Sequence, residues 1–85
     1  MISWAISWEK RALKELAKLD RPHRARVVEA VEGLAKDPFL GTALEGQWEG
    51  LRRLRVGSYR IIYALDRGQL LVLVLRVGHR REVYR

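Results

Sequence analysis

The segment 51-LRRLRVGSYRIIY-63 places several arginines on what its residue pattern predicts to be two short strands. Apolar and basic residues alternate with a period of two on both sides of Gly57-Ser58, which is typical of strands with one apolar face. Glycine readily adopts the positive φ of the first central position of a type II′ turn, so this pair suits a two-residue hairpin loop. The sequence therefore predicts a tight hairpin.

In this hairpin Arg55 lies directly opposite Arg60, and Arg53 lies two residues along on the same face. Like charges that face each other across strands are destabilising. The arrangement becomes favourable when an anion lies between the guanidinium groups, which form forked, charge-assisted bonds to phosphate oxygens. The pattern indicates a phosphate-binding site, although both side chains pointing separately into water is the simpler alternative.

The chain end adds a second group of candidate residues directly after Gly78. Histidine exchanges protons near neutral pH, and a tyrosine ring stacks on unpaired RNA bases. His79 and Tyr84 are therefore candidates for catalysis or base contact, although either residue alone would more often be an ordinary surface or core residue. The further cations expected to contact RNA are Arg52, Arg80, Arg81 and Arg85.

The net charge of +7 is distributed unevenly along the 85 residues. Residues 1–50 contain eight basic and eight acidic side chains, whereas residues 51–85 contain nine arginines against Asp66 and Glu82. The whole excess thus lies in the last part of the chain, which favours a polyanionic partner such as nucleic acid.

The composition also excludes several classes of protein. There is no cysteine, so disulfides and thiolate metal sites are excluded. The N-terminus lacks the apolar core of a signal peptide, and no apolar run reaches membrane-spanning length. The length suits one domain, residues 1–85, and we expect a cytoplasmic protein that makes no membrane contact.

The elements that must position these residues follow from the apolar periods. Residues 2–8 alternate as a strand, and residues 9–19 and 21–35 show helical spacing on either side of Asp20-Arg21-Pro22. Asp20 can cap the second helix, and a short connection makes the two helices an antiparallel hairpin. The apolar stripe of the first helix is expected at Ala12, Leu13, Leu16 and Ala17.

The remainder of the chain reads as a loop followed by strands. Residues 38–50 show no period and are expected to form a loop packed by Phe39, Leu44 and Trp48. Residues 69–77 are apolar at almost every position, which predicts a central strand covered on both faces and ended by Gly78. The predicted fold class is α+β: an N-terminal strand, a helical hairpin, and a three- to four-stranded antiparallel sheet.

The chain resembles the RelE/ParE superfamily, specifically its RelE-type toxins of type II toxin–antitoxin systems, over nearly all 85 residues. The resemblance rests on 12-ALKELAKL-19, 50-GLRRLRVGSYRIIY-63 and 77-VGHRREVY-84. It implies a β-α-α-β-β-β(-β) fold and a ribosome-dependent mRNA endoribonuclease that acts in the ribosomal A site and inhibits translation. It also implies a cognate RelB-like antitoxin, acidic and with an amphipathic helix, and contact with operator DNA only through the toxin–antitoxin complex.

Carried over by position, the basic residues of the RelE-type site fall on Arg53, Arg55, Arg60 and Arg80, and the terminal aromatic residue on Tyr84. The reaction implied uses no metal or cofactor: the ribose 2′-hydroxyl attacks the adjacent phosphate and leaves a cyclic phosphate. Some family members have lysine at the positions of Arg53 and Arg55. Because arginine stays protonated, the base would be His79, Glu82, Tyr84 or a ribosomal group, and weak or absent activity remains open.

Two other functions stay open from the sequence. The first is a ParE-like inhibitor of DNA gyrase, which is not an enzyme and shares the fold. The second is a basic nucleic-acid-binding module without toxicity. The arginine cluster together with Tyr84 favours the ribonuclease, because the ParE branch usually lacks that combination.

Overall fold

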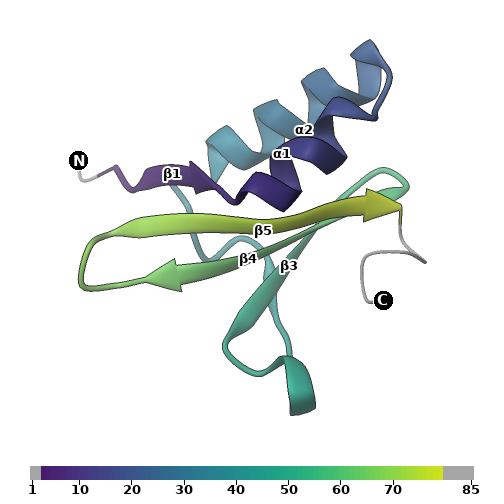
Figure 1. Ribbon diagram of the computed structural model, residues 1–85. Helices are drawn as coiled ribbons and strands as arrows, with labels where there is room; N and C mark the ends of the chain where they lie inside the picture. Colours follow the sequence, from purple (N-terminus) through teal and green to yellow (C-terminus); the bar gives the residue numbers. More distant parts are fainter. Residues whose placement is uncertain (1–2, 80–85) are drawn as a thin grey trace.

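Two helices lie on one side of a five-stranded sheet in the computed structural model, which describes residues 3–79 (Figure 1). The elements are β1 (Ala5–Trp8), α1 (Lys10–Ala17), α2 (Arg21–Gly33), β2 (Thr42–Ala43), the 3₁₀ helix η1 (Gly46–Trp48), β3 (Leu51–Val56), β4 (Tyr59–Asp66) and β5 (Leu71–His79). The strand order is β1-β5-β4-β3-β2. The predicted α+β class, with a helical hairpin on one face of the sheet, is confirmed.

The sheet differs from the prediction in two details. Its five strands fit the predicted N-terminal strand followed by three or four strands, but β1 pairs with β5 in parallel while the other pairs are antiparallel. The additional strand, β2, lies within the expected loop and pairs Thr42 with Arg53 and Ala43 with Arg52. A two-residue strand has no detectable period, so the sequence pattern did not reveal it.

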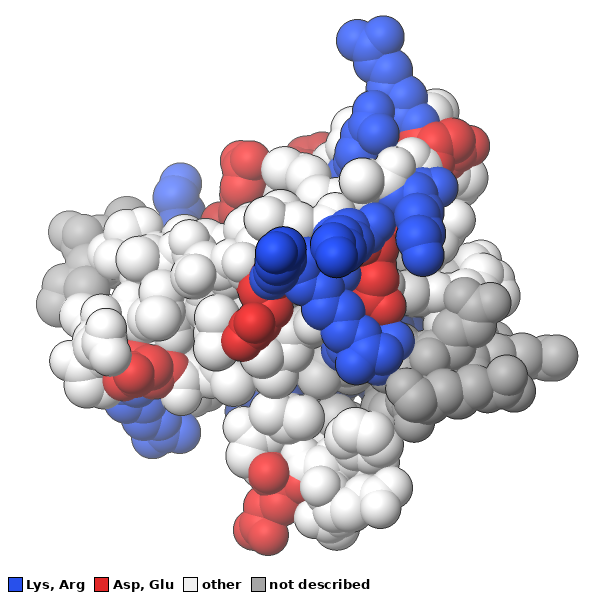
Figure 2. All heavy atoms as spheres, viewed as in Figure 1, with Lys and Arg blue, Asp and Glu red and all other residues white. Residues whose placement is uncertain are grey.

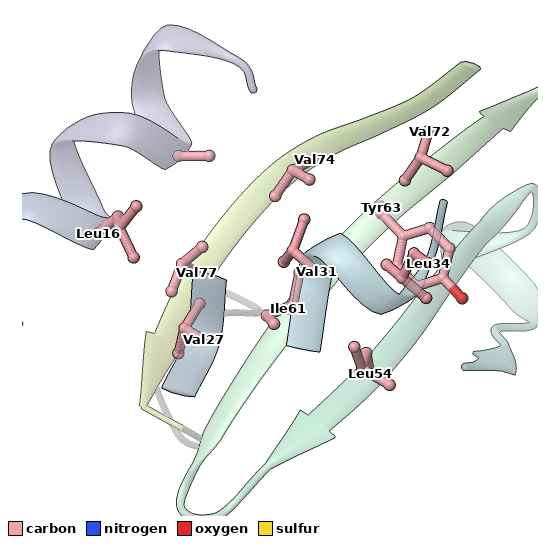
Figure 3. Close-up of a cluster of buried hydrophobic side chains, with 11 residues drawn as sticks. Leu16, Val27, Val31, Leu34, Leu54, Ile61, Tyr63, Val72, Val74 and Val77 are labelled. Carbon is pink, nitrogen blue, oxygen red and sulfur yellow. The ribbon is translucent and has the colours of Figure 1, made fainter. Parts of the chain in front are cut away.

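The core lies between the helices and the sheet (Figure 3). Val27, Val31 and Leu34 of the second helical segment are fully buried, as their spacing predicts. On α1 the predicted stripe was wrong in part: Ala12 and Leu16 are buried, but Leu13 is 48% exposed and Ala17 is exposed. The helix is rotated so that Glu15, rather than an apolar residue, completes its inner side.

Glu15 explains this rotation by joining α1 to β5. Its carboxylate accepts three hydrogen bonds at 2.9–3.1 Å from the guanidinium of Arg76 and one at 3.0 Å from the backbone N–H of Val77. Because β1 reaches only as far as Val74, the Glu15 carboxylate takes over as acceptor where the parallel strand pair ends. Burial alone raises the pKa of Glu15, but the bonds and charge of Arg76, with Val77 and Arg11, hold the pKa below its ordinary 4.5.

A second long-range contact fixes the connection from α2 to β2. The hydroxyl of Tyr63, fully buried on β4, donates to the carbonyl of Pro38 at 2.9 Å and accepts the N–H of Gly41 at 3.0 Å. A Cβ at position 41 would lie 2.5 Å from the Arg53 carbonyl oxygen and 2.6 Å from the Tyr63 hydroxyl. Only glycine permits this close approach.

The side chains expected to pack the loop are less buried than predicted. Phe39 is 46% exposed, and Leu44 and Trp48 are half-buried. The ring of Phe39 lies edge-on to Trp4, with the guanidinium groups of Arg52 and Arg67 at 5.3 and 5.2 Å from its centre. The loop is therefore held by Tyr63 and Arg52 more than by its own apolar residues.

The strand β5 ends later in the chain than the sequence pattern predicts. The strand lies between β1 and β4 and continues through Gly78 to His79, so the predicted stop at Gly78 was wrong. Val72, Val74 and Val77 face the helices, whereas Leu71, Leu73 and Leu75 are only half-buried, so the strand is not fully covered on both faces. None of the helices formed within residues 3–79 has the length and apolar character needed to cross a membrane.

Candidate functional site

The hairpin of β3 and β4 has the predicted register. Gly57 has a φ of 60°, as the first position of the turn requires. Val56 pairs with Tyr59, Arg55 with Arg60, and Leu54 with Ile61. Leu54 and Ile61 belong to the core, so the alternation of strand side chains directs Arg55 and Arg60 to the opposite side.

Arg53, Arg55 and Arg60 lie together on the side of the sheet that the helices leave uncovered; we call these three residues the arginine face. Arg55 is exposed, and Arg53 and Arg60 are half-buried. Ile62, the register partner of Arg53, is only 2% exposed, and the aliphatic stems of neighbouring arginines are suited to cover such a residue. The site thus has an apolar floor beneath several cationic groups.

The electrostatic surroundings of the arginine face favour anions. Neither β3 nor β4 contains an acidic residue before Asp66, at the far end of β4 from the turn. Two guanidinium groups in direct cross-strand register, with the one carboxylate of their strands at the far end of β4, create a positive local potential. Forked donors at such a position bind phosphate oxygens.

Arg52 does not join the arginine face. It alternates with Arg53 on β3, and its Nη2 donates to the backbone carbonyls of Phe39 at 3.0 Å and Gly41 at 2.5 Å. These bonds hold the chain that precedes β2. The geometry indicates a structural role for Arg52, which the sequence did not reveal because its two acceptors are more than ten residues away.

His79 also lies apart from the arginine face. It pairs with Tyr59, whereas Arg60 pairs with Gly78, so His79 and Arg60 project to opposite sides of the sheet. Its ring lies edge-on to that of Tyr59, with centres 6.0 Å apart, and Tyr59 also contacts His23 of α2 at 5.3 Å. His79 therefore belongs to an aromatic group on the helical side and is badly placed to act on a phosphate held by Arg55 and Arg60.

His23 is in turn paired with Asp20, the residue before α2. Asp20 occupies the N-cap position as expected, but its carboxylate binds the His23 ring and makes no side-chain hydrogen bond to the helix backbone. The hydrogen bond from His23 lowers the pKa of Asp20. This pair was not among the residues predicted to be functional, and it supports the start of α2 beside Tyr59.

The other predicted site residues, Arg80, Arg81, Glu82, Tyr84 and Arg85, lie outside the described residues. Of the residues carried over from the RelE-type site, the structure thus brings together Arg53, Arg55 and Arg60. Gly78 and His79, at the end of β5, pair with Arg60 and Tyr59 next to the hairpin turn of β3 and β4.

Comparison with known proteins gives a consistent result. Residues 6–84 match the family described as the ParE toxin of the type II toxin–antitoxin system, parDE. The chain is 33% identical to Toxin RelG of Mycobacterium tuberculosis (96% of this chain and 97% of the relative). It is 37% identical to Toxin RelE of the same organism (87% of this chain and 78% of the relative).

A solved structure shares the whole fold. The toxin–antitoxin complex RelBE2 of Mycobacterium tuberculosis contains a chain that superposes with a TM-score of 0.87 at 32% identity, covering 96% of this chain and 97% of that one. Both relatives above carry RelE-type names, although the family model bears the ParE name. The chain therefore belongs to the RelE/ParE superfamily and is a RelE-type toxin of a type II toxin–antitoxin system.

Proposed function

We propose that this toxin cleaves mRNA on the ribosome and that the arginine face holds the phosphodiester that is cut. The observation that carries the proposal is the direct cross-strand pairing of Arg55 with Arg60, with Arg53 on the same face. Two guanidinium groups paired in this way repel each other, and a bound anion offsets that repulsion. RNA supplies that anion, and fixed cations stabilise the charge that develops when the 2′-hydroxyl attacks the phosphate.

Each arginine has a role that follows from its position. Arg55 and Arg60, on opposite strands, approach the phosphate from two sides, and Arg53 extends the cationic surface along β3. Arg80 would complete the clamp, and the ring of Tyr84 would stack on a base next to the cleaved bond. The reaction leaves a cyclic phosphate on one fragment and a 5′-hydroxyl on the other.

Proton transfer is not a role for the arginines, since a guanidinium does not release its proton at neutral pH. His79 projects to the helical side, so it is also unsuited to remove the proton from the attacking hydroxyl. The proposal therefore gives the arginines charge stabilisation and orientation, and leaves the base to Glu82, Tyr84 or a group of the ribosome.

The partners follow from the same surface. A cognate antitoxin with an acidic segment could neutralise the toxin by covering the arginine face, since complementary charge favours such an interface. The similar RelBE2 structure is a toxin–antitoxin complex, which supports a RelB-like antitoxin. Binding of operator DNA would belong to that complex, and activity on ribosomes would place the toxin in the cytoplasm.

One observation favours a second function, because the matching family model is named for the ParE toxin. A ParE-like toxin would inhibit DNA gyrase without cleaving RNA. Cross-paired arginines on an open sheet face are suited to a phosphodiester and have no evident purpose in such an inhibitor. We therefore place the ribonuclease first.

Mapping of transcript 5′ ends after induced expression tests the proposal. The wild-type toxin should generate new 5′ ends within translated regions. It should cleave the same message in a lysate that contains ribosomes and leave it intact in a lysate depleted of ribosomes. A matched assay follows supercoiling of a plasmid by gyrase in the presence of the purified toxin.

The two functions give opposite results in these assays. New 5′ ends with unaffected supercoiling support the ribonuclease. Intact transcripts with inhibited supercoiling would replace it with the gyrase inhibitor, and the absence of both effects, with harmless expression, would leave a basic nucleic-acid-binding protein.

A further inference from the structure

The outer side of α1 carries a second group of cations, separate from the arginine face. Lys10, Arg11, Lys14 and Lys18 are all exposed. At 3.6 residues per turn, they fall within an arc of about 100° around the helix axis. We call these four residues the α1 basic arc; Figure 2 shows Lys and Arg side chains gathered over this helix.

Of the four residues in this arc, Arg11 interacts with the neighbouring acid Glu15 and helps to lower its pKa. Glu15 follows Lys14 in the sequence, but its carboxylate is bonded to Arg76 and to the backbone of Val77 on β5. Residues 1–50 carry no net charge as a whole, but the outer surface of α1 carries an excess of positive charge. On this helix Glu15 is directed inward, and the lysines and Arg11 are directed outward. This separation depends on the fold and is invisible in the composition.

The helix itself would be more stable without this arrangement. Lys10 and Arg11 occupy its first turn, which contains no acidic residue, and Glu9 at the N-cap makes no side-chain capping bond. The positive end of the helix dipole disfavours cations at this position. Lys14, in the last turn, and Lys18, at the C-cap, lie where the dipole favours cations. Only Lys10 and Arg11 therefore work against their own helix, and these two are better explained by a partner than by stability.

The chemistry of the arc identifies the kind of partner. Lysine is depleted in protein–protein interfaces, whereas surfaces that bind nucleic acid are much more positively charged. Lys10, Lys14 and Lys18 follow one another at a rise of roughly 6 Å along the helix. Leu13, on the margin of the arc, is the one large apolar side chain exposed on the described α1. Such a row suits phosphates rather than an apolar peptide.

We propose that the α1 basic arc binds the sugar–phosphate backbone of double-stranded RNA without reading its sequence. The arc belongs to the helical layer, and the arginine face lies on the uncovered side of the sheet. One molecule can thus contact structured RNA through α1 while a single strand occupies the arginine face. This inference goes beyond the proposed function and does not require that RNA be cleaved.

The experiment compares three forms of the full chain for binding to a short RNA duplex of mixed sequence. The test variant carries Lys10→Gln, Lys14→Gln and Lys18→Gln. The control variant carries Arg26→Gln, Lys36→Gln and Arg67→Gln, three exposed cations outside α1, so that the net charge changes equally. Affinity is measured by fluorescence anisotropy over a series of salt concentrations, and circular dichroism verifies the fold.

The α1 variant should bind the duplex at least about tenfold more weakly at physiological salt. The slope of log K against log salt concentration should become shallower by about one for each lysine that contacts a phosphate. The control should remain close to the wild type in both quantities, because its cations lie elsewhere.

Three results would overturn the inference. The α1 variant could bind the duplex as tightly as the wild type, or the α1 and control variants could lose the same affinity for it. In the third, the α1 variant would lose affinity for a polyglutamate peptide and keep its affinity for the duplex. The last would assign the arc to an acidic protein. Cleavage of ribosome-bound mRNA is measured separately. A chain that binds the duplex through α1 but cleaves nothing would refute the proposed function alone.

Discussion

Under the proposed function, Arg55 and Arg60 are the residues at which stability and function oppose each other. Their cross-strand register brings two like charges together, and a structure under selection for stability alone would place an opposite charge or a polar residue at one position. A bound phosphodiester attracts both guanidinium groups and so replaces their repulsion with a favourable interaction. The pair is therefore expected to weaken the free protein and to strengthen its complex with RNA.

Replacing Arg55 with glutamine should separate these two effects. Arg55 is exposed, so its removal creates no cavity and relieves repulsion of a few tenths of a kcal/mol to about 1 kcal/mol. Arg55→Gln should unfold at an equal or slightly higher urea concentration than the wild type while its cleavage of ribosome-bound mRNA falls at least tenfold. Urea titrations at low salt, paired with a cleavage assay, check both.

An exposed cation away from the site provides the control. Lys36→Gln changes the net charge equally and should leave cleavage unchanged. A variant at Arg55 that loses stability while keeping full activity would show that this arginine stabilises the hairpin and has no part in the reaction.

At the scale of elements, Glu15 determines how α1 meets β5. Its carboxylate binds Arg76 and the N–H of Val77 with both side chains mostly buried. Glu15→Gln should lower the free energy of unfolding at pH 7 by about 1.5–3 kcal/mol, the range for hydrogen bonds to charged groups. Urea titration of the two forms measures this difference directly.

The same contact predicts a dependence on pH. Since the pKa of Glu15 is lower in the folded state than its ordinary 4.5, its contribution is complete above that value and is lost as the pH falls through the folded pKa. The difference in stability between Glu15→Gln and the wild type should therefore narrow below about pH 4. A constant difference down to pH 2 would mean that shape, and not charge, gives Glu15 its role. Glu32→Gln, at an exposed position of α2, serves as the control.

Tyr63 has a comparable role for the chain before β2. Its hydroxyl satisfies the buried carbonyl of Pro38 and the N–H of Gly41. Tyr63→Phe keeps the ring but leaves both groups without this partner, which should cost about 1–3 kcal/mol. Hydrogen exchange of the Gly41 amide should accelerate in this variant; protection equal to the wild type would show that Arg52 holds the segment alone.

Local patterns predicted those parts of the molecule that depend on adjacent residues. The period of two and the Gly57 turn determine the register of Arg55 and Arg60, so this register was predicted and is confirmed. The part that the two residues play in a site stays a prediction. The side of the sheet to which His79 projects was not predicted, because Gly78 was wrongly expected to end the strand. With β5 continuing through it, the alternation turns the ring of His79 to Tyr59.

Contacts between distant residues account for what the sequence did not reveal. The period of α1 suggested Leu13 and Ala17 for its inner side, because an acidic residue is rarely placed toward a core. Glu15 occupies that side since Arg76, 61 residues later, supplies the opposite charge. Arg52 was grouped with the RNA-binding cations for the same reason: its carbonyl acceptors at Phe39 and Gly41 belong to another segment.

Viewed as a whole, the molecule separates its charges by layer. The sheet presents the arginine face on its uncovered side, and α1 presents lysines on the helical side. Glu15, which lies between α1 and β5, is paired with Arg76. A toxin of this design is expected to make strongly salt-dependent complexes with RNA.

Cleavage of mRNA on programmed ribosomes by an Arg55→Gln and Arg60→Gln double variant is the most direct measure of the central claim. The account predicts that the wild type cuts the message and leaves a cyclic phosphate, while the folded double variant loses at least a hundredfold in rate and the Lys36→Gln control does not. Undiminished cleavage by the double variant, with an unchanged melting profile, would contradict the claim that these two arginines hold the phosphodiester.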